Sequence, residues 1–316
     1  MAKILIIGGA GFVGSHLADV CLEKDNQVTV YDNFSVGRRD FLPDDHRLHI
    51  IEGDILDMQG LSEAMKDFNP ELVFHLAAIH HIPTCEKHPE QALRVNVEGI
   101  QSVLSASARH NVTKVVFTST GALYDPKQDG ALNERSALRA QNVYAISKLA
   151  GEQLLAHYTQ EHQRKAVVAR LFNVVGRRET NPHVIPAILA QLHQGKRKVS
   201  LGNLAPRRDY VHVEDVAEGL YALGKMPSES EYDVFNIGSG IEHSVKDLVM
   251  YLSEIIGEPI EIVSDPSRRR KGDRLSQLAN IDKIRRAVDW QPARTLQQAL
   301  AEIWDDVLHG YVVAGR

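Results

Sequence analysis

The chain is poor in cysteine, in excess basic charge and in long apolar runs, and each shortage excludes a class of protein. Its two cysteines, Cys21 and Cys85, are too few for a disulfide framework and lack metal-ligand spacing, which favours a reducing compartment. No apolar run approaches the length of a membrane span, and no charged leader with a cleavage site precedes the first apolar segment. We therefore expect a soluble, cytoplasmic protein with no membrane partner.

The balance of charge argues against nucleic acid as a partner. The chain has 36 Lys and Arg against 41 Asp and Glu, a formal net charge of -5. The nearest feature to a basic patch is the run at residues 268–271, which would suit a single phosphate-bearing ligand. With 316 residues, 43% of them hydrophobic, the chain is long enough for one large domain or two small ones.

Glycines at the end of the first apolar run are the most informative feature of the sequence. The run at residues 3–7 is followed by Gly8, Gly11 and Gly14 at the start of a helical segment. Such a strand-to-helix turn directs main-chain N–H groups and a helix N-terminus at one spot, where a pyrophosphate binds. The next apolar run ends in Asp32, the acid expected to bind the adenosine ribose hydroxyls. Because this carboxylate would repel a 2′-phosphate, the pattern predicts NAD rather than NADP.

Strands and amphipathic helices alternate through the first half of the sequence. Apolar runs typical of strands buried on both faces of a parallel sheet lie at residues 3–7, 28–31, 49–52, 72–76, 114–118 and 166–170. Helical spacing lies between them, at residues 15–24, 61–67, 89–111 and 144–163. The alternation predicts an α/β protein with a Rossmann-type doubly wound parallel sheet.

The pattern loosens after about residue 175, where prolines interrupt short elements. We predict a dinucleotide-binding Rossmann domain over residues 1–174, rejoined by about residues 211–240, with a strand at 232–236 that returns to the main sheet. Residues 175–316 are expected to form mainly a smaller, mixed α/β substrate-binding region. Ligands of doubly wound folds bind at the carboxyl edge of the sheet, which this region would cap.

A second group of residues, Tyr144-x-x-x-Lys148, stands at the start of a predicted helix. Residues four apart share one helical face, so the Lys148 ammonium can lie near the Tyr144 phenol and favour its ionised form. A phenolate is a general base for a sugar or alcohol hydroxyl. The bare pattern also occurs by chance on exposed helices, and it gains weight from the dinucleotide fingerprint. Upstream, the strand at 114–118 leads into Thr120, whose hydroxyl would hydrogen-bond the reacting oxygen.

With these motifs the sequence resembles the extended short-chain dehydrogenase/reductases, and within them the nucleotide-sugar epimerase/dehydratase group typified by UDP-glucose 4-epimerase. The resemblance covers nearly the whole chain. Its further motifs are Asp32-Asn33-Phe34-Ser35, Gly53-Asp54-Ile55, His75-Leu76-Ala77-Ala78, Asn96, Arg170-Leu171-Phe172-Asn173, Arg208-Asp209-Tyr210 and Phe235-Asn236-Ile237-Gly238.

The resemblance implies a role for each matching residue. Those expected to bind NAD are Gly8, Gly11, Phe12, Val13, Gly14, Asp32, Asn33, Ser35, Gly37, Asp54, Ile55, Leu76, Ala77, Ala78, Asn96, Thr118, Tyr144 and Lys148. Those expected to bind the substrate are His81, Thr120, Asn173, Arg208, Arg270 and Asp273. The implied catalytic residues are Thr120, Tyr144 and Lys148.

By the same resemblance, the expected activity is NAD-dependent epimerisation at C4 of a UDP-hexose, UDP-N-acetylhexosamine or UDP-hexuronate. Tyr144 would take the proton of the 4-hydroxyl while hydride passes to tightly bound NAD, and the 4-keto sugar would then be reduced on its other face. A homodimer is also expected, because relatives pair the helices equivalent to residues 97–110 and 147–161. Apolar residues such as Val97, Ile100, Val103 and Leu104 occur on more than one face of the first helix.

Alternatives within the family remain open. Its dehydratases and decarboxylases carry acid–base residues just after the catalytic threonine, where this chain has Gly121 and Ala122, and this disfavours both reactions. A 4-ketoreductase would be expected to use NADPH, against Asp32. A non-catalytic dinucleotide sensor, the most remote alternative, would be expected to lack the Tyr144–Lys148 pair.

Two pairs of residues near the expected sugar site have no single predicted role. Arg177 and Arg178 would suit the carboxylate of a hexuronate, although loop arginines are more often simply exposed. His80 and His81 would form a polar wall, hydrogen-bond the sugar or act as an auxiliary acid. No acidic partner and no His/Cys cluster at ligand spacing accompanies them in the sequence, so no metal is predicted.

Overall fold

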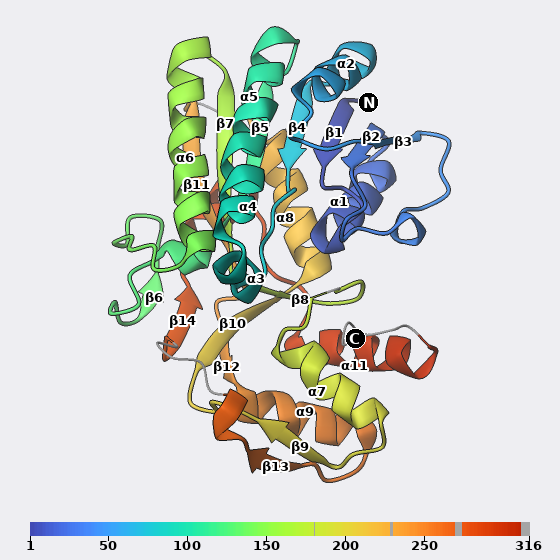
Figure 1. Cartoon of the computed structure of the whole chain (residues 1–316), viewed down its shortest axis with the longest axis vertical. Helices are drawn as coiled ribbons and strands as arrows, with labels where there is room; N and C mark the ends of the chain where they lie inside the picture. Colours follow the sequence, from blue (N-terminus) through green and yellow to red (C-terminus); the bar gives the residue numbers. More distant parts are fainter. Residues whose placement is uncertain (180, 228–229, 269–273, 311–316) are drawn as a thin grey trace.

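A seven-stranded parallel sheet forms the centre of the computed structural model, which describes residues 1–179, 181–227, 230–268 and 274–310 (Figure 1). The strand order is β11-β7-β5-β4-β1-β2-β3, so the chain winds outward in both directions from the β1–β4 pair. This confirms the predicted Rossmann-type doubly wound sheet. The strands are β1 (Lys3–Ile7), β2 (Gln27–Asp32), β3 (Leu48–Glu52), β4 (Leu72–His75), β5 (Lys114–Thr120), β7 (Lys165–Leu171) and β11 (Tyr232–Ile237).

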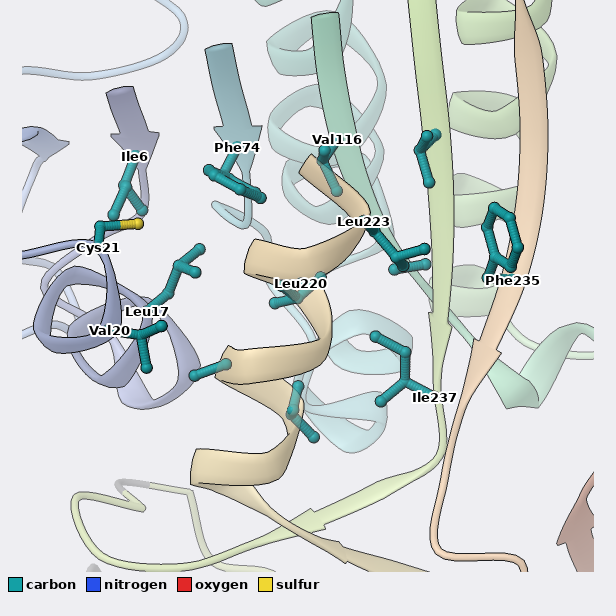
Figure 2. Packing of buried hydrophobic residues seen from close by; sticks show 14 of the residues in the cluster. Ile6, Leu17, Val20, Cys21, Phe74, Val116, Leu220, Leu223, Phe235 and Ile237 are labelled. Carbon is teal, nitrogen blue, oxygen red and sulfur yellow. The ribbon is translucent and has the colours of Figure 1, made fainter. Parts of the chain in front are cut away.

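Helices cover both faces of this sheet, because successive residues of each central strand point to opposite sides. Ile6 of β1 packs into a cluster with Leu17 and Leu220 (Figure 2), whereas its neighbour Ile7 packs into a second cluster with Leu61. The first cluster is covered by α1 (Phe12–Glu23) and α8 (Val213–Lys225), and the second by α2 (Met58–Phe68), α5 (Gly99–Arg109) and α6 (Val143–His162).

The helix predicted over residues 89–111 is interrupted. It consists of α4 (Pro89–Leu93), a π-helical turn (Arg94–Glu98) and α5, and it follows the short helix α3 (Ile82–Lys87). Such π turns inside helices are frequent at functional sites. Ile100 and Val103 of α5 are fully buried against the sheet of the same chain, so they do not form the second apolar face that the sequence analysis assigned to a partner.

The rest of the chain forms a second, smaller unit at the carboxyl edge of the sheet, which we call the capping region (residues 173–212 and 242–308) (Figure 1). Its own apolar core gathers side chains of α7, α9 and α11. Its elements are β8 (Asn173–Val175), α7 (Val184–His193), β9 (Lys198–Leu201), β10 (Arg207–His212), β12 (Glu242–Ser244), α9 (Val245–Ile256), β13 (Glu261–Ser264), β14 (Ser276–Ala279) and α11 (Leu296–Leu308). The short helix α10 (Asp282–Val288) instead packs against β11 of the main sheet, where Ile284 joins the first cluster.

Between the two parts of the capping region, the chain returns to the main sheet. Strand β11 pairs in parallel with β7 from Tyr232 opposite Ala166 to Ile237 opposite Leu171. This confirms the strand predicted at residues 232–236. Strand β10 joins β8, β12 and β14 in a small mixed sheet, which ends on β6 (Ala131–Leu132). In the part of the chain that the structure describes, no helix combines the length and the hydropathy needed to cross a bilayer.

Candidate active site

A cleft of about 1130 Å³ lies between the carboxyl ends of the parallel strands and the capping region. The segments that follow β1, β2, β4 and β5 form one wall. Residues of β8 and β10, with residues 176–179 and 181–183 and the start of the next helix at 184–187, form the other. Almost all of the site residues predicted from the sequence line this cleft, although they come from eight separate stretches of chain.

The glycine turn after β1 is shaped by main-chain contacts that a side chain would block. Gly8 has φ +81°, and a Cβ atom there would lie 2.5 Å from the main-chain nitrogen of Ala77. A Cβ atom on Gly14 would lie 2.2 Å from the Gly8 carbonyl oxygen. Gly11 precedes α1 with no side-chain cap, so the N–H groups of the first helical turn are left for an anion.

Asp32 is held rigidly at the end of β2. Its side chain is 9% exposed, and its two oxygens accept hydrogen bonds of 2.9 Å from the main-chain N–H groups of Ala10 and Phe34. Burial raises the pKa of this carboxyl above its ordinary value, and the two main-chain donors oppose that shift. Beside it, the Asn33 amide donates to Asp54 over 3.0 Å. This edge of the cleft has the acid that the ribose site requires.

Tyr144 and Lys148 lie on the wall of the cleft beside the end of β5. The Lys148 ammonium, in a residue only 3% exposed, donates to the carbonyl oxygen of Thr118 over 2.9 Å and stands 4.7 Å from the centre of the Phe117 ring. The Tyr144 phenol shares a hydrogen bond with the Thr120 side chain. The three predicted catalytic side chains are therefore in one place.

Burial shifts the pKa values of these two side chains in opposite directions. Burial raises the pKa of the Tyr144 phenol, while the hydrogen bond from Thr120 opposes the rise. Burial also lowers the pKa of Lys148 to about 7, so at neutral pH the amine carries only part of a positive charge. Desolvation disfavours the charged form of each group, and the expectation that Lys148 favours the ionised phenol stays a prediction.

Asn96 is the predicted cofactor residue that does not line the cleft. It is buried in the π-helical turn, where its amide accepts from the Ile79 N–H over 2.8 Å and donates to the Ile79 carbonyl over 2.9 Å. It also donates to the Ser147 hydroxyl over 2.9 Å. Asn96 thereby fastens the loop that carries Ala77 and Ala78 to the helix that carries Tyr144 and Lys148.

On the capping wall, Asn173 and Arg208 line the cleft as predicted. Arg208 donates to the carbonyl oxygens of Arg207 and Arg274 over 2.9 and 2.8 Å. Arg270 and Asp273, also predicted to bind substrate, lie outside the described residues. Arg274, which the sequence analysis did not name, lines the cleft, and burial together with the nearby Arg208 lowers its pKa. In the sequence, the only feature that points to Arg274 is its position three residues after the basic run at 268–271.

The sequence model of the NAD-dependent epimerase/dehydratase family matches residues 4–238, which span the glycine turn, the trio Thr120, Tyr144 and Lys148, and the returning strand. The chain belongs to this family. NAD is the cofactor of the family, and the residues here fit it: the glycine turn leaves room for a pyrophosphate, and the fixed Asp32 meets the requirement of a ribose without a 2′-phosphate.

Relatives of known activity match over nearly their whole length. The UDP-glucose 4-epimerase of Corynebacterium glutamicum is 32% identical over 318 residues, which cover 96% of this chain and 94% of that protein. The structure of UDP-glucose 4-epimerase from Thermotoga maritima with UDP-glucose has a TM-score of 0.89 at 30% identity, covering 96% of this chain and 97% of that one. The corresponding enzyme of Thermus thermophilus, in complex with NAD, has a TM-score of 0.87 at 30% identity, covering 98% and 99%.

Two arginines that would suit a sugar carboxylate are engaged elsewhere. Arg178 donates to the carboxylate of Asp19 on α1 over 2.8 Å. Arg177 lies 3.6 and 3.5 Å from the carboxylates of Asp305 and Asp306 on α11. Both line the cleft, yet their charges are already balanced by three aspartates, which weakens the case for a hexuronate carboxylate at this point.

Gly121 and Ala122 follow Thr120 in a single 3-10 turn (Gly121–Leu123). A Cβ atom on Gly121 would lie 2.9 Å from the Gln277 side-chain nitrogen and 3.3 Å from the Phe172 ring. The turn is thus packed tightly, and neither residue offers a group that moves a proton. The chain therefore has no acid–base pair directly after Thr120.

The two predicted histidines of the sugar site both line the cleft. The His81 ring shares a hydrogen bond of 2.9 Å with the Thr84 hydroxyl. His80 lies deeper, and burial, with a smaller contribution from Lys148, lowers its pKa to about 4. His80 is therefore neutral at neutral pH and has no proton to spare as an auxiliary acid.

Proposed function

We propose that this protein is an NAD-dependent 4-epimerase of a nucleotide sugar, acting on a UDP-hexose, a UDP-N-acetylhexosamine or a UDP-hexuronate. The observation that carries the proposal is the meeting of Tyr144, Thr120 and Lys148 in one cleft with a glycine turn that fits NAD. The named activities of the relatives support the same reaction.

In the proposed mechanism, Tyr144 accepts the proton of the sugar 4-hydroxyl and Thr120 hydrogen-bonds the same oxygen as negative charge develops on it. Lys148, fixed by the Thr118 carbonyl, stabilises the phenolate that must form during the step. Bound NAD would supply a reversible hydride acceptor for C4, and its positively charged ring would favour the ionised phenol. After the 4-keto sugar turns over in the cleft, Tyr144 returns the proton to the oxygen of the epimer.

The absence of an acid–base pair in the turn after Thr120 favours epimerisation over dehydration. Elimination of water across C5 and C6 needs a second base and an acid near those carbons. Gly121 and Ala122 supply neither, and the neutral His80 supplies no proton. Epimerisation needs only the proton and hydride steps that the trio and NAD provide.

The diphosphate would be bound by the capping wall, where Asn173, Arg208 and Arg274 line the cleft. Guanidinium groups pair well with phosphate oxygens in a partly desolvated site. We also assign substrate contacts to Arg270 and Asp273, as the family resemblance implies. The nucleotide is proposed to be uridine because the relatives named above act on UDP-glucose.

The test is incubation of the purified protein, with NAD alone, against UDP-glucose, UDP-N-acetylglucosamine, UDP-glucuronate, dTDP-glucose and GDP-mannose, followed by NMR of the products. A C4 epimer from a UDP-sugar supports the proposal. A 4-keto-6-deoxy product would replace it with a dehydratase, and a requirement for stoichiometric reduced cofactor would replace it with a 4-ketoreductase. If no substrate turns over while NAD binds normally, the non-catalytic sensor is favoured.

We also propose that the protein works as a homodimer in the cytoplasm, with α5 and α6 in the subunit contact. Ile146, near the start of α6, is exposed, as is Leu93 of α4, which packs beside α6. Both cysteines are buried and unpaired, as a reducing compartment allows. Light scattering should give twice the mass of one chain, and Ile146→Lys should lower it toward one. Cell fractionation tests the compartment.

A further inference from the structure

Three metal-ligating side chains from distant parts of the sequence meet on the wall of the cleft. His80 follows β4, whereas Glu179 and His183 belong to the segment between β8 and α7, and Glu179 follows His80 by 99 residues. One ligand atom from each lies within 4.8 Å of the other two. All three residues are partly buried and line the cleft.

The loop that carries His80 is held in place by the structure around it. Asn96 fastens the neighbouring Ile79 through two hydrogen bonds of 2.8 and 2.9 Å. The Nε2 atom of His80 faces the stretch that carries Glu179 and His183, since it lies 3.0 Å from the side-chain nitrogen of Asn181. A histidine in a fastened loop, with its Nε2 atom directed into a cluster of possible ligands, is preorganised to bind a metal.

Two possible ligands of this cluster, His80 and Glu179, already face the same side-chain amide. The Asn181 side-chain nitrogen lies 3.0 Å from His80 Nε2 and 3.4 Å from the Glu179 carboxylate oxygen. The His183 ring packs against the ring of His80, with centroids 6.1 Å apart. An amide N–H₂ group thus takes the place between an imidazole nitrogen and a carboxylate where a small cation would bind more strongly.

We propose that His80, Glu179 and His183 form a binding site for a divalent transition-metal cation such as Zn²⁺ or Co²⁺. Two imidazoles and one carboxylate are ligands that these cations prefer. Three protein ligands leave coordination positions that face the cleft, as in metal sites that bind a further ligand. In a tetrahedral zinc site the ligand atoms are about 3.3 Å apart, so the side chains must draw in around the cation and displace the Asn181 amide.

The sequence alone predicted no metal because it contains no local cluster of ligands. His80 is followed directly by His81, but Glu179 lies 99 residues after His80. No spacing in the sequence therefore links the proposed ligands. The site depends on the capping region folding over the sheet, which brings the 179–183 segment to the loop after β4. The inference is independent of the proposed epimerase reaction, since it concerns cation binding in the absence of substrate.

The experiment is calorimetric titration of the full-length, chelator-treated protein with Zn²⁺, and optical titration with Co²⁺. We expect one cation per chain and visible Co²⁺ absorption bands of nitrogen and oxygen coordination. His183→Ala and Glu179→Gln should each weaken binding at least ~10-fold. The matched control is His193→Ala, which removes an exposed histidine from the other end of the same helix and should leave the affinity unchanged.

Two results would overturn the proposal. One is equal affinity of the wild-type protein and His183→Ala for both cations, with Glu179→Gln also unchanged. The other is a loss of binding in His193→Ala as large as in His183→Ala, which would show that scattered surface histidines hold the metal. NAD content and far-UV circular dichroism of each variant establish that it is folded, and the two separate ligand variants keep the test valid if one of them is not.

Discussion

The two walls of the cleft are built by different means. On the sheet wall, shape comes from the main chain: Gly8 at φ +81°, the uncapped start of α1, and Asp32 held by two N–H groups. On the capping wall, it comes from side chains held by distant partners, as Arg178 is by Asp19. Main-chain geometry needs a few residues close in sequence, whereas the capping wall can change its side chains without disturbing the fold. The residues that we propose for cofactor binding and proton transfer lie on the sheet wall, and the proposed diphosphate contacts Asn173 and Arg208 lie on the capping wall.

We expect the largest effect from Tyr144→Phe, which removes one hydroxyl group from the sheet wall. We expect turnover to fall ~10³-fold or more, because general acid–base catalysis contributes about 10²–10⁴-fold, while NAD stays bound. The measurement is the epimerisation rate by NMR beside the NAD content of the protein. The matched control is Tyr158→Phe on the same helix, whose buried hydroxyl has no hydrogen-bond partner among the described residues and whose loss should leave the rate unchanged. Full activity of Tyr144→Phe would refute the assignment.

The next largest effect is expected from Glu152→Gln, below the catalytic pair. Glu152 and Arg170 are 2% and 4% exposed and form an ion pair of 2.6 Å between α6 and β7. Removing one charge leaves the other buried without compensation, which should lower the free energy of unfolding by about 3–5 kcal/mol. Denaturant titration measures it.

The exposed pair Arg38–Asp40 supplies the control for that prediction. Its side chains are 48% and 58% exposed, so Asp40→Asn should cost less than about 1 kcal/mol. A similar loss in both variants would mean that burial does not decide the contribution of these ion pairs.

Gly8→Ala tests whether the glycine turn is needed for NAD binding, as distinct from the strain that a side chain causes at positive φ. An added Cβ atom would lie 2.5 Å from the Ala77 nitrogen, so the variant should lose NAD as well as about 1–3 kcal/mol of stability. Gly195 has nearly the same backbone angle, φ +78°, with no atom within 4 Å of its added Cβ. Gly195→Ala should therefore show the strain without the loss of NAD. Equal NAD content in the two variants would contradict the role given to the glycine turn.

The smallest effect is expected on the capping wall, from Arg177→Gln. Its ion pairs with Asp305 and Asp306 are partly exposed, so stability should change by less than about 1 kcal/mol. Because both aspartates already engage Arg177, the KM for UDP-glucuronate relative to UDP-glucose should also stay the same. A selective rise in the KM for UDP-glucuronate would instead show that Arg177 leaves its aspartates to bind the sugar carboxylate.

The sequence was enough to predict the doubly wound sheet, the returning strand at β11 and the glycine turn that fits NAD. Each depends on features that are local in the chain: apolar runs, three glycines within one turn, and an acid at the end of the next strand. The pair Tyr144 and Lys148 was found for the same reason, since a spacing of four places two side chains on one helical face.

Only the tertiary structure decided the surroundings of these residues. It placed Asn96 behind the cleft as a clamp on Ile79, gave Arg177 and Arg178 aspartate partners on α11 and α1, and buried Lys148 so that its pKa fell to about 7. It also brought His80 within reach of Glu179 and His183. Spacing along the chain carries no information on such contacts, because they form only when the capping region folds onto the carboxyl edge of the sheet.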